Sequence, residues 1–230
     1  MKEADASICL SECQRRWIKK FDEMRNLDAD LELAAPFLSV ADSLDDQTGA
    51  GPILLVGKAT DKDWRRKQFL SAAGGSTEER VGERRKATRH HLDYVSQHQF
   101  SAFWRFWKHL SKIGSPVIWT NLAKIGVLHG NPGHKYLKAQ QELARITLRA
   151  EISEYRPVLV VITGDYAKSE IVLPVFGDRS RWKEPPDYEF CWIERTISKP
   201  AVLWTDHPER KLNFRVQRWL DKARELAQPL

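Results

Sequence analysis

The sequence has too few cysteines to build most thiol-based sites. It contains 3 cysteines among 230 residues, at Cys9, Cys13 and Cys191. An odd number of thiols cannot pair completely in disulfides, and the set is too small for an iron–sulfur cluster or a cysteine-only zinc site. The adjacent His90 and His91 show no ligand-like spacing to Cys191 either. We therefore expect no metal and no cofactor.

Long apolar runs and an export signal are missing as well. The longest apolar run lies near residues 158–162, well short of the roughly 18 residues that a membrane span requires. Residues 1–10 carry acidic side chains and lack the apolar segment of a secretory signal. Together with the unpaired cysteines, these absences predict a cytoplasmic protein that does not contact membranes. We also expect a monomer.

Positive charge is in moderate excess and is concentrated in one segment. The chain has 37 Lys and Arg against 31 Asp and Glu, a net charge of +6, which permits a polyanionic partner without requiring one. Basic residues crowd residues 62–89 around several glycines, and we expect a flexible basic insertion near residues 62–92. Such a segment would bind DNA in a salt-dependent way. An ordinary solvated surface is the alternative, since Glu78, Glu79 and Glu83 partly neutralise it.

Tryptophan is unusually frequent, with 9 copies in the chain. Several large aromatic residues repeat at helical spacing over residues 100–110, which predicts a helix packed on a sheet. They are Phe103, Trp104 and Trp107, flanked by Phe100 and Leu110. Aromatic side chains mostly fill cores, and their flat faces can also stack on a nucleic-acid base.

Short apolar runs alternate with helical patterns along the chain. The runs cover residues 53–56, 117–119, 158–162 and 201–204, and each follows a proline. Proline suits the first residue of a strand, where its missing N–H does no harm. Helical patterns cover residues 11–27, 136–155 and 212–223. Strands that are apolar throughout, alternating with helices, predict an α/β fold: a three-layer α/β/α sandwich with a central, mostly parallel four-stranded sheet.

We expect two parts of unequal size. Residues 1–51 would form an N-terminal helical extension packed on the core, and residues 52–230 would form the α/β domain that carries the basic insertion.

Polar or flexible residues follow each apolar run. They are Gly57, Asn121, Gly164 and His207. The carboxyl ends of parallel strands lie at one edge of a sheet, where ligands bind, so these residues should converge. Each has an ordinary explanation by itself: an asparagine caps turns, a glycine opens a helix, and a histidine occupies many loops.

The four segments resemble, in order and spacing, the motifs of the uracil-DNA glycosylase-like superfamily, as in a divergent bacterial-type member. The first motif is a strand with a Gly-led loop over residues 53–60, and the second is Asn121 followed by Lys124. The third is a helix, Arg-Pro, an apolar strand and Gly164, and the last is His207-Pro208. The matches span residues 53–208.

The resemblance implies a hydrolase that cleaves the N-glycosidic bond of a deaminated or damaged base in single- or double-stranded DNA. Such an enzyme takes the base out of the stack into a pocket. Asn121 would read the base edge with its amide donor and acceptor, and His207 would donate a hydrogen bond to the departing base. Pro208 would stiffen the loop. Gly57, Ala59, Thr60 and Gly164 would line the pocket or approach the phosphate closely.

Lys58 departs from the family pattern. The family usually places a carboxylate or an amide there to hold water. Lys58 could contact a phosphate or attack the sugar as an amine, and it could act as a base only if burial lowered its pKa strongly. Asp61 or Asp63 could hold the water instead, or both could be ordinary loop carboxylates. The expected DNA contacts are Lys124, Arg65, Arg66, Arg84, Arg85 and Arg210.

Two other functions fit the same sequence. A module of the same fold could bind nucleic acid without hydrolysis, which would be consistent with Lys58. An unrelated α/β protein could hold a phosphorylated small molecule at the strand ends. The first alternative shares the salt-dependent DNA binding of an enzyme, and the second predicts none.

Overall fold

A computed structural model describes most of the chain, which divides into two compact units. The described residues are 8–27, 33–40, 51–59, 75–98, 101–113, 116–127, 133–164, 170–186, 190–209, 211 and 213–228. Unit 1 comprises Met1–Val40, Lys58–Leu92 and Asn121–Glu154, and unit 2 comprises Ala41–Gly57, Asp93–Thr120 and Tyr155–Leu230. Each unit combines distant segments of the sequence. The boundary at residue 52 stays a prediction.

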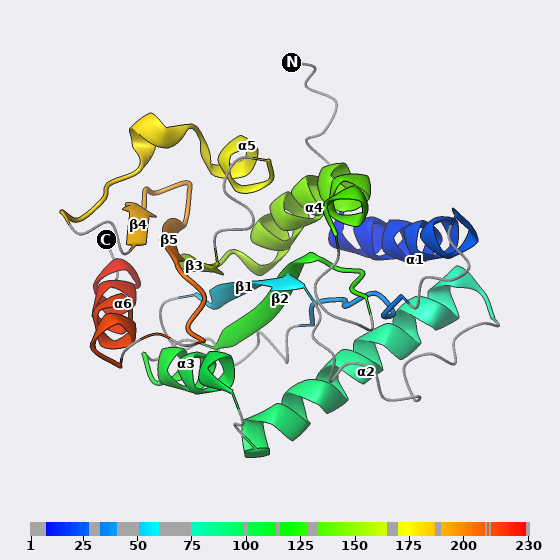
Figure 1. Ribbon diagram of the computed structural model, residues 1–230, viewed down its shortest axis with the longest axis horizontal. Helices are drawn as coiled ribbons and strands as arrows, with labels where there is room; N and C mark the ends of the chain where they lie inside the picture. The colour runs from blue at the N-terminus through cyan, green and yellow to red at the C-terminus, as the bar shows by residue number, and fades with distance from the viewer. Residues whose placement is uncertain are drawn as a thin grey trace. The chain divides into compact units, whose positions relative to one another are not determined.

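The described strands form one five-stranded sheet in the order β2-β1-β3-β5-β4 (Figure 1). Their bounds are β1 Ile53–Ala59, β2 Val117–Ala123, β3 Leu159–Thr163, β4 Phe190–Ile193 and β5 Ala201–Thr205. β3 pairs in parallel with β1 and with β5, so that Val161 lies between Leu55 and Leu203. The predicted α/β class with a mostly parallel sheet is confirmed.

The predicted number of strands is wrong, because β4 adds a fifth strand at the edge of the sheet. β4 runs antiparallel to β5, with Cys191 opposite Trp204. It has 4 residues, and only Cys191 among them is buried. Its residues are all apolar, but the run follows Glu189 rather than a proline, so it lacks the signal that the four predicted runs share.

The prolines before the strands act as the sequence predicts. The Pro116 carbonyl accepts the Ile53 N–H at 2.8 Å, and the Pro52 carbonyl accepts the Val158 N–H at 2.9 Å. A proline has a carbonyl acceptor but no N–H donor. At the start of a strand it therefore joins the hydrogen-bond ladder without leaving a donor unpaired.

The core of unit 2 is built on β3 and β5, whose residues are all buried. Helices α3 (Ala102–Ser111), α5 (Val172–Phe176) and α6 (Asn213–Leu226) accompany them, with a short 3-10 turn at Arg179–Arg181. α6 packs against β5 and β3, and α3 packs against α6. Phe106 of α3 meets Trp219 of α6 edge to face, with 6.2 Å between ring centroids. The helices predicted near residues 100–110 and 212–223 are confirmed.

Unit 1 contains α1 (Leu10–Leu27) and most of both α2 (Thr77–His98) and α4 (His134–Tyr155). α1 and α4 confirm the helices predicted at residues 11–27 and 136–155. Both guanidinium NH groups of Arg80 bond the Asp22 carboxylate, at 2.6 and 2.7 Å, and join α2 to α1. No helix in the described ranges is long and apolar enough to cross a membrane.

The flexible basic insertion was expected near residues 62–92, of which residues 62–74 lie outside the described residues. Flexibility is wrong for residues 77–92, which belong to the helix α2. Ser76 and Glu79 form a capping box at its start. The Ser76 hydroxyl accepts the Glu79 N–H at 3.3 Å, and the Glu79 carboxylate accepts the Ser76 N–H at 2.6 Å. The Ser76 backbone and hydroxyl contacts hold the pKa of Glu79 below its ordinary value. These bonds satisfy donors that a helix start otherwise leaves open.

Truncation of a core strand residue should destabilise the protein far more than truncation of an exposed one. Leu203 in β5 is 0% exposed, whereas Ile197 is 101% exposed. We expect Leu203→Ala to lower the free energy of unfolding by about 2–5 kcal/mol and Ile197→Ala to change it by less than about 0.5 kcal/mol. Urea titration followed by tryptophan fluorescence measures both. Equal effects would contradict the central position of β5.

Candidate functional site

In unit 2, the segments after β3 and β5 lie next to each other. Gly164 follows β3 directly; its N–H donates to the Thr205 carbonyl at 2.8 Å, and its carbonyl accepts the Trp204 indole N–H at 2.9 Å. Its φ of +90° is a value that side chains with a Cβ rarely adopt, and a Cβ added there would lie 4.0 Å from the His207 Cβ. Glycine at 164 therefore sets the backbone path beside His207.

His207 lies in the loop after β5, with its side chain 42% exposed. Its Nδ1 accepts the backbone N–H of Glu209 at 3.2 Å. A neutral imidazole has one donor and one acceptor nitrogen, so in the neutral form this bond would leave the proton on Nε2. The Glu209 carboxylate also lies 3.9 Å from Nδ1.

The loop that carries His207 is held on both sides. Asp206 binds the Lys211 ammonium at 2.9 Å, and the Pro208 carbonyl accepts the Lys211 N–H at 3.4 Å. Pro208 itself is buried. These contacts hold Asp206 and Pro208, the residues on either side of the histidine.

An aromatic cluster, made of Phe103, Trp104, Trp107 and Trp119, packs beside His207. The Phe103 ring lies 5.9 Å from the His207 ring, centroid to centroid, with only 14° between their planes. Trp104 contacts Phe103, Trp107 and Trp119 edge to face, with centroids 5.1, 6.3 and 4.7 Å away. The sequence predicts Phe103, Trp104 and Trp107 as the packed face of a helix and Trp119 as the end of a strand; it does not predict that Phe103 stacks on the histidine.

In unit 1, Asn121 is 2% exposed. It lies inside β2 rather than past its end, which corrects the predicted position. Its side-chain Nδ2 has no hydrogen-bond partner within the described part of the chain. Leaving a buried amide donor unpaired costs about 1–3 kcal/mol, and such a group requires an explanation. A ligand oxygen would satisfy it.

Lys124 does not lie on the surface, contrary to the predicted DNA contact. Its ammonium bonds Glu151 Oε1 at 2.6 Å, and the two side chains are 2% and 1% exposed. The same oxygen accepts the Ser39 hydroxyl at 2.7 Å, and the Ser39 carbonyl accepts the Gln14 amide at 3.3 Å. Burial lowers the pKa of Lys124, and the Glu151 carboxylate partly offsets this. Lys124 therefore belongs to a buried network.

The same network fixes the chain just after Asn121. The Gln140 side chain of α4 accepts the Ile125 N–H and donates to the Ile125 carbonyl, both at 2.9 Å. The Lys124 carbonyl accepts the Phe37 N–H at 2.9 Å. The backbone that follows Asn121 is thus held from two directions within unit 1.

The remaining predicted residues fall into three groups. Gly57, Lys58 and Ala59 lie inside β1 rather than in a loop, with Gly57 buried and Lys58 partly exposed. On α2, Arg85 is exposed, whereas Arg84 is 3% exposed; burial removes Arg84 from the expected DNA contacts and lowers its pKa. Outside the described residues lie Thr60, Asp61, Asp63, Arg65, Arg66 and Arg210.

Within the residues that the structure describes, no group of His, Cys, Asp and Glu is arranged to hold a metal ion. The described groups that could act on a ligand are therefore an imidazole donor at His207, a buried amide at Asn121, and exposed cations on α2. No family model and no curated protein matches this chain.

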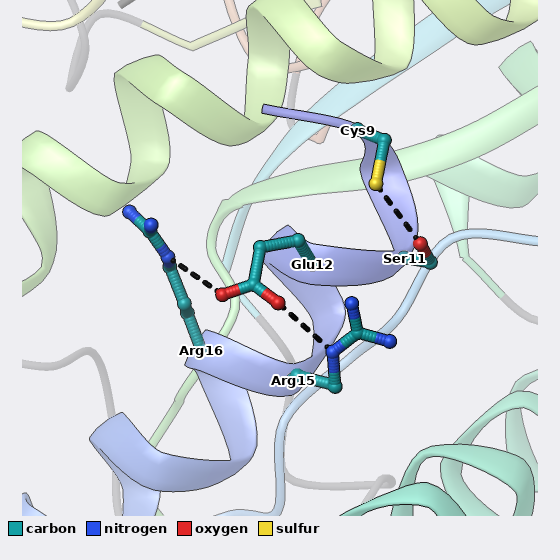
Figure 2. Close-up of polar contacts among 5 residues, drawn as sticks. All are labelled: Cys9, Ser11, Glu12, Arg15 and Arg16. Carbon is teal, nitrogen blue, oxygen red and sulfur yellow. Dashed lines mark hydrogen bonds and ion pairs between the residues drawn. The ribbon is translucent and has the colours of Figure 1, made fainter. Parts of the chain in front are cut away.

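A separate polar cluster lies at the start of α1 (Figure 2). The exposed Cys9 thiol lies 3.1 Å from the Ser11 hydroxyl. Glu12 bonds Arg15 at 2.9 Å and Arg16 at 3.2 Å, one carboxylate oxygen to each. The Ser11 hydroxyl has the largest effect in lowering the pKa of the Cys9 thiol, and the Glu12 backbone N–H has the second largest. Burial raises the pKa of Cys13, one turn further on.

Breaking the buried ion pair should cost more than replacing it. We expect Lys124→Met to lower the free energy of unfolding by about 3–5 kcal/mol, because Glu151 keeps a buried charge without its cation. The double variant Lys124→Met/Glu151→Met should recover most of that loss, since apolar side chains of similar volume then fill the site. Urea titrations of the single and double variants measure both. A Lys124→Met protein as stable as wild type would contradict the ion pair.

The two N-terminal thiols should react at different rates. A neutral alkylating reagent should modify Cys9 first, and its rate should begin to rise at a lower pH than for an ordinary thiol, because the thiolate is the nucleophile. Cys13, 0% exposed, should react only when the protein unfolds. Mass spectrometry of labelled peptides, with Cys9→Ser as control, follows both sites. Comparable native rates would contradict the assignment.

Proposed function

We propose that this protein is a DNA glycosylase-like hydrolase that cleaves the N-glycosidic bond of a deaminated or damaged base. The observation that carries the proposal is His207, held after β5 beside Gly164 with its Nδ1 accepting the Glu209 N–H. The four ordered sequence motifs and the parallel pairing of β1, β3 and β5 support it. We further propose that the fold is the three-layer α/β/α sandwich of the superfamily that the motifs resemble.

In this proposal, Asn121 recognises the base and His207 stabilises the negative charge that develops on it. The everted base offers a carbonyl and an N–H along its edge. The Nδ2 of Asn121, which has no partner among the described residues, would donate to that carbonyl, and the Oδ1 would accept from that N–H. As the bond between C1′ and the base nitrogen breaks, its electron pair leaves with the base. The Nε2–H of His207 would stabilise the resulting negative charge, as a preorganised donor does.

The attacking water needs its own partner. Its oxygen forms the new bond to C1′ and its proton passes to a base, for which we propose Asp61. Lys58 lies partly exposed in β1, which favours contact with a phosphate. The exposed Arg85 and Arg89 of α2 would add further phosphate contacts, and the counterions that they displace would make binding weaken as salt rises.

An excision assay tests the activity. Labelled single- and double-stranded oligonucleotides carrying uracil, hypoxanthine or a mismatch are incubated with the protein and then treated with alkali. We expect strand breaks at one of these bases. Asn121→Ala and His207→Ala should each lower the rate by about 10²–10³-fold, as removal of a transition-state donor does. The exposed Asn26 and His109 supply matched controls, and Asn26→Ala and His109→Ala should retain the rate.

Other outcomes assign other functions. DNA binding that weakens with salt but yields no breaks would identify a non-hydrolytic binding module, the role that Lys58 in the first motif favours. Absence of both binding and breaks would leave the small-molecule function. A borohydride-trapped adduct that is lost in Lys58→Ala would show that the lysine attacks the sugar.

A further inference from the structure

The His207 ring has a neighbour that limits its rotation. Phe103, on α3, lies nearly parallel to the imidazole, 5.9 Å away and 14° from coplanar orientation. A flat ring against one face opposes rotation of the imidazole out of its plane. The Glu209 N–H, 3.2 Å from Nδ1, fixes the direction of the ring within that plane. The two contacts together determine where Nε2 points.

Phe103 is itself fixed by its neighbours. Trp104 meets it at 85°, with centroids 5.1 Å apart, and Trp119 meets it at 58°, with centroids 5.9 Å apart. Trp119 belongs to β2 and is 6% exposed, and it also packs edge to face on Trp104. The Ser101 hydroxyl, which accepts the Trp104 N–H, caps the start of α3. Phe103 is therefore a rigid support connected to the sheet.

Gly164, which has no side chain, lies beside the histidine on a third side. Gly164, with its φ of +90°, brings the backbone after β3 next to the His207 Cβ. Any other residue there would strain the backbone that defines this position. His207 is thus approached from three places: by the Phe103 ring of α3, by the Glu209 N–H of its own loop, and by the Gly164 backbone at the end of β3.

We propose that Phe103 is the positioning residue of the proposed reaction, which holds the His207 imidazole so that Nε2–H points at the departing base. The consequence for catalysis rests on the proposed function. A hydrogen-bond donor lowers a barrier only when it is already aimed at the atom where charge develops. One face of Phe103 is used by His207, so that face does not stack on the base.

Kinetic variants test the catalytic half of this inference. Phe103→Leu keeps an apolar side chain and removes the flat ring. We expect kcat to fall by about tenfold to about hundredfold, while KM stays close to wild type, because the donor acts on the transition state. Phe103→Tyr, which keeps the ring, should have a kcat close to that of wild type. Phe106→Leu is the matched control: it removes a buried phenylalanine of the same helix that packs on Trp219, and it should destabilise the fold but retain kcat.

A second readout does not depend on activity. In ¹⁵N-histidine NMR spectra, with the His207 signals identified by their loss in His207→Ala, wild type should show a pyridine-like Nδ1 and a pyrrole-like Nε2. Phe103→Leu should show mixed tautomers and faster ring motion, whereas Phe103→Tyr and Phe106→Leu should resemble wild type. If Phe103→Leu unfolds, Phe103→Met replaces it in both experiments, because methionine is also apolar and also lacks the flat ring.

The two readouts separate the two ideas. If wild type excises no base but Phe103→Leu releases the imidazole, the proposed function fails and the positioning role stands. If Phe103→Leu leaves both kcat and the His207 tautomer unchanged, the positioning role is overturned, whatever the activity. A loss of kcat that Phe106→Leu reproduces to the same extent would also overturn it, because the effect would then be structural.

Discussion

The described site in unit 2 depends on the parallel pairing of β3 with its two neighbours. β3 lies between β1 and β5, and all of its residues are buried. Burial on both faces requires that every backbone donor and acceptor be paired within the sheet. The register places Thr163 opposite Thr205. The residues that come next on each strand, Gly164 and the loop with His207, are therefore neighbours because the ladder aligns the strands above them.

A second constraint operates in unit 1, where several polar side chains are buried together with the apolar core. Lys124, Glu151 and Ser39 share bonds that leave little freedom to the chain after β2. A buried charge pair contributes little net stability and strongly penalises alternatives in which one partner is missing. Its effect is to fix the position of Asn121 and the backbone beside it. Rigid support behind a single buried amide is what a site needs to distinguish one ligand edge from another.

Part of this arrangement follows from the sequence alone. The proline before each apolar run predicted the strands correctly. Proline has no backbone N–H to donate, so it is tolerated at the start of a strand and not in its middle. The start of α2 has a sequence signal too: Ser76 and Glu79 have the spacing of a capping box, although the glycines and basic residues around them favour a loop. β4 is an apolar run of four residues that follows Glu189 and not a proline, so the pattern that predicts the other strands does not predict it.

The side-chain contacts could not be predicted in this way. Lys124 and Arg84 look like surface cations in the sequence, and their burial depends on packing partners that spacing does not reveal; Glu151 is 27 residues from Lys124. The stack of Phe103 on His207 joins α3 to a loop after the last strand, so it depends on the order of strands in the sheet. Helical periodicity predicted the helix itself and Leu110 on its packed face, but it did not include Phe106, which is buried, and it gave no information about what the face meets.

The edge strand has a consequence for how this protein avoids unwanted association. β4 is short, and its Trp192 already exchanges both backbone hydrogen bonds with Lys183, at 2.8 and 2.9 Å. The Lys222 ammonium lies 4.1 Å from the centre of the Trp192 ring. A brief edge that is paired to another segment and flanked by lysines is a poor template for a strand from a second molecule. At the β4 edge, the sheet is therefore protected from growing, by strand addition, into the aggregates to which open sheet edges are prone.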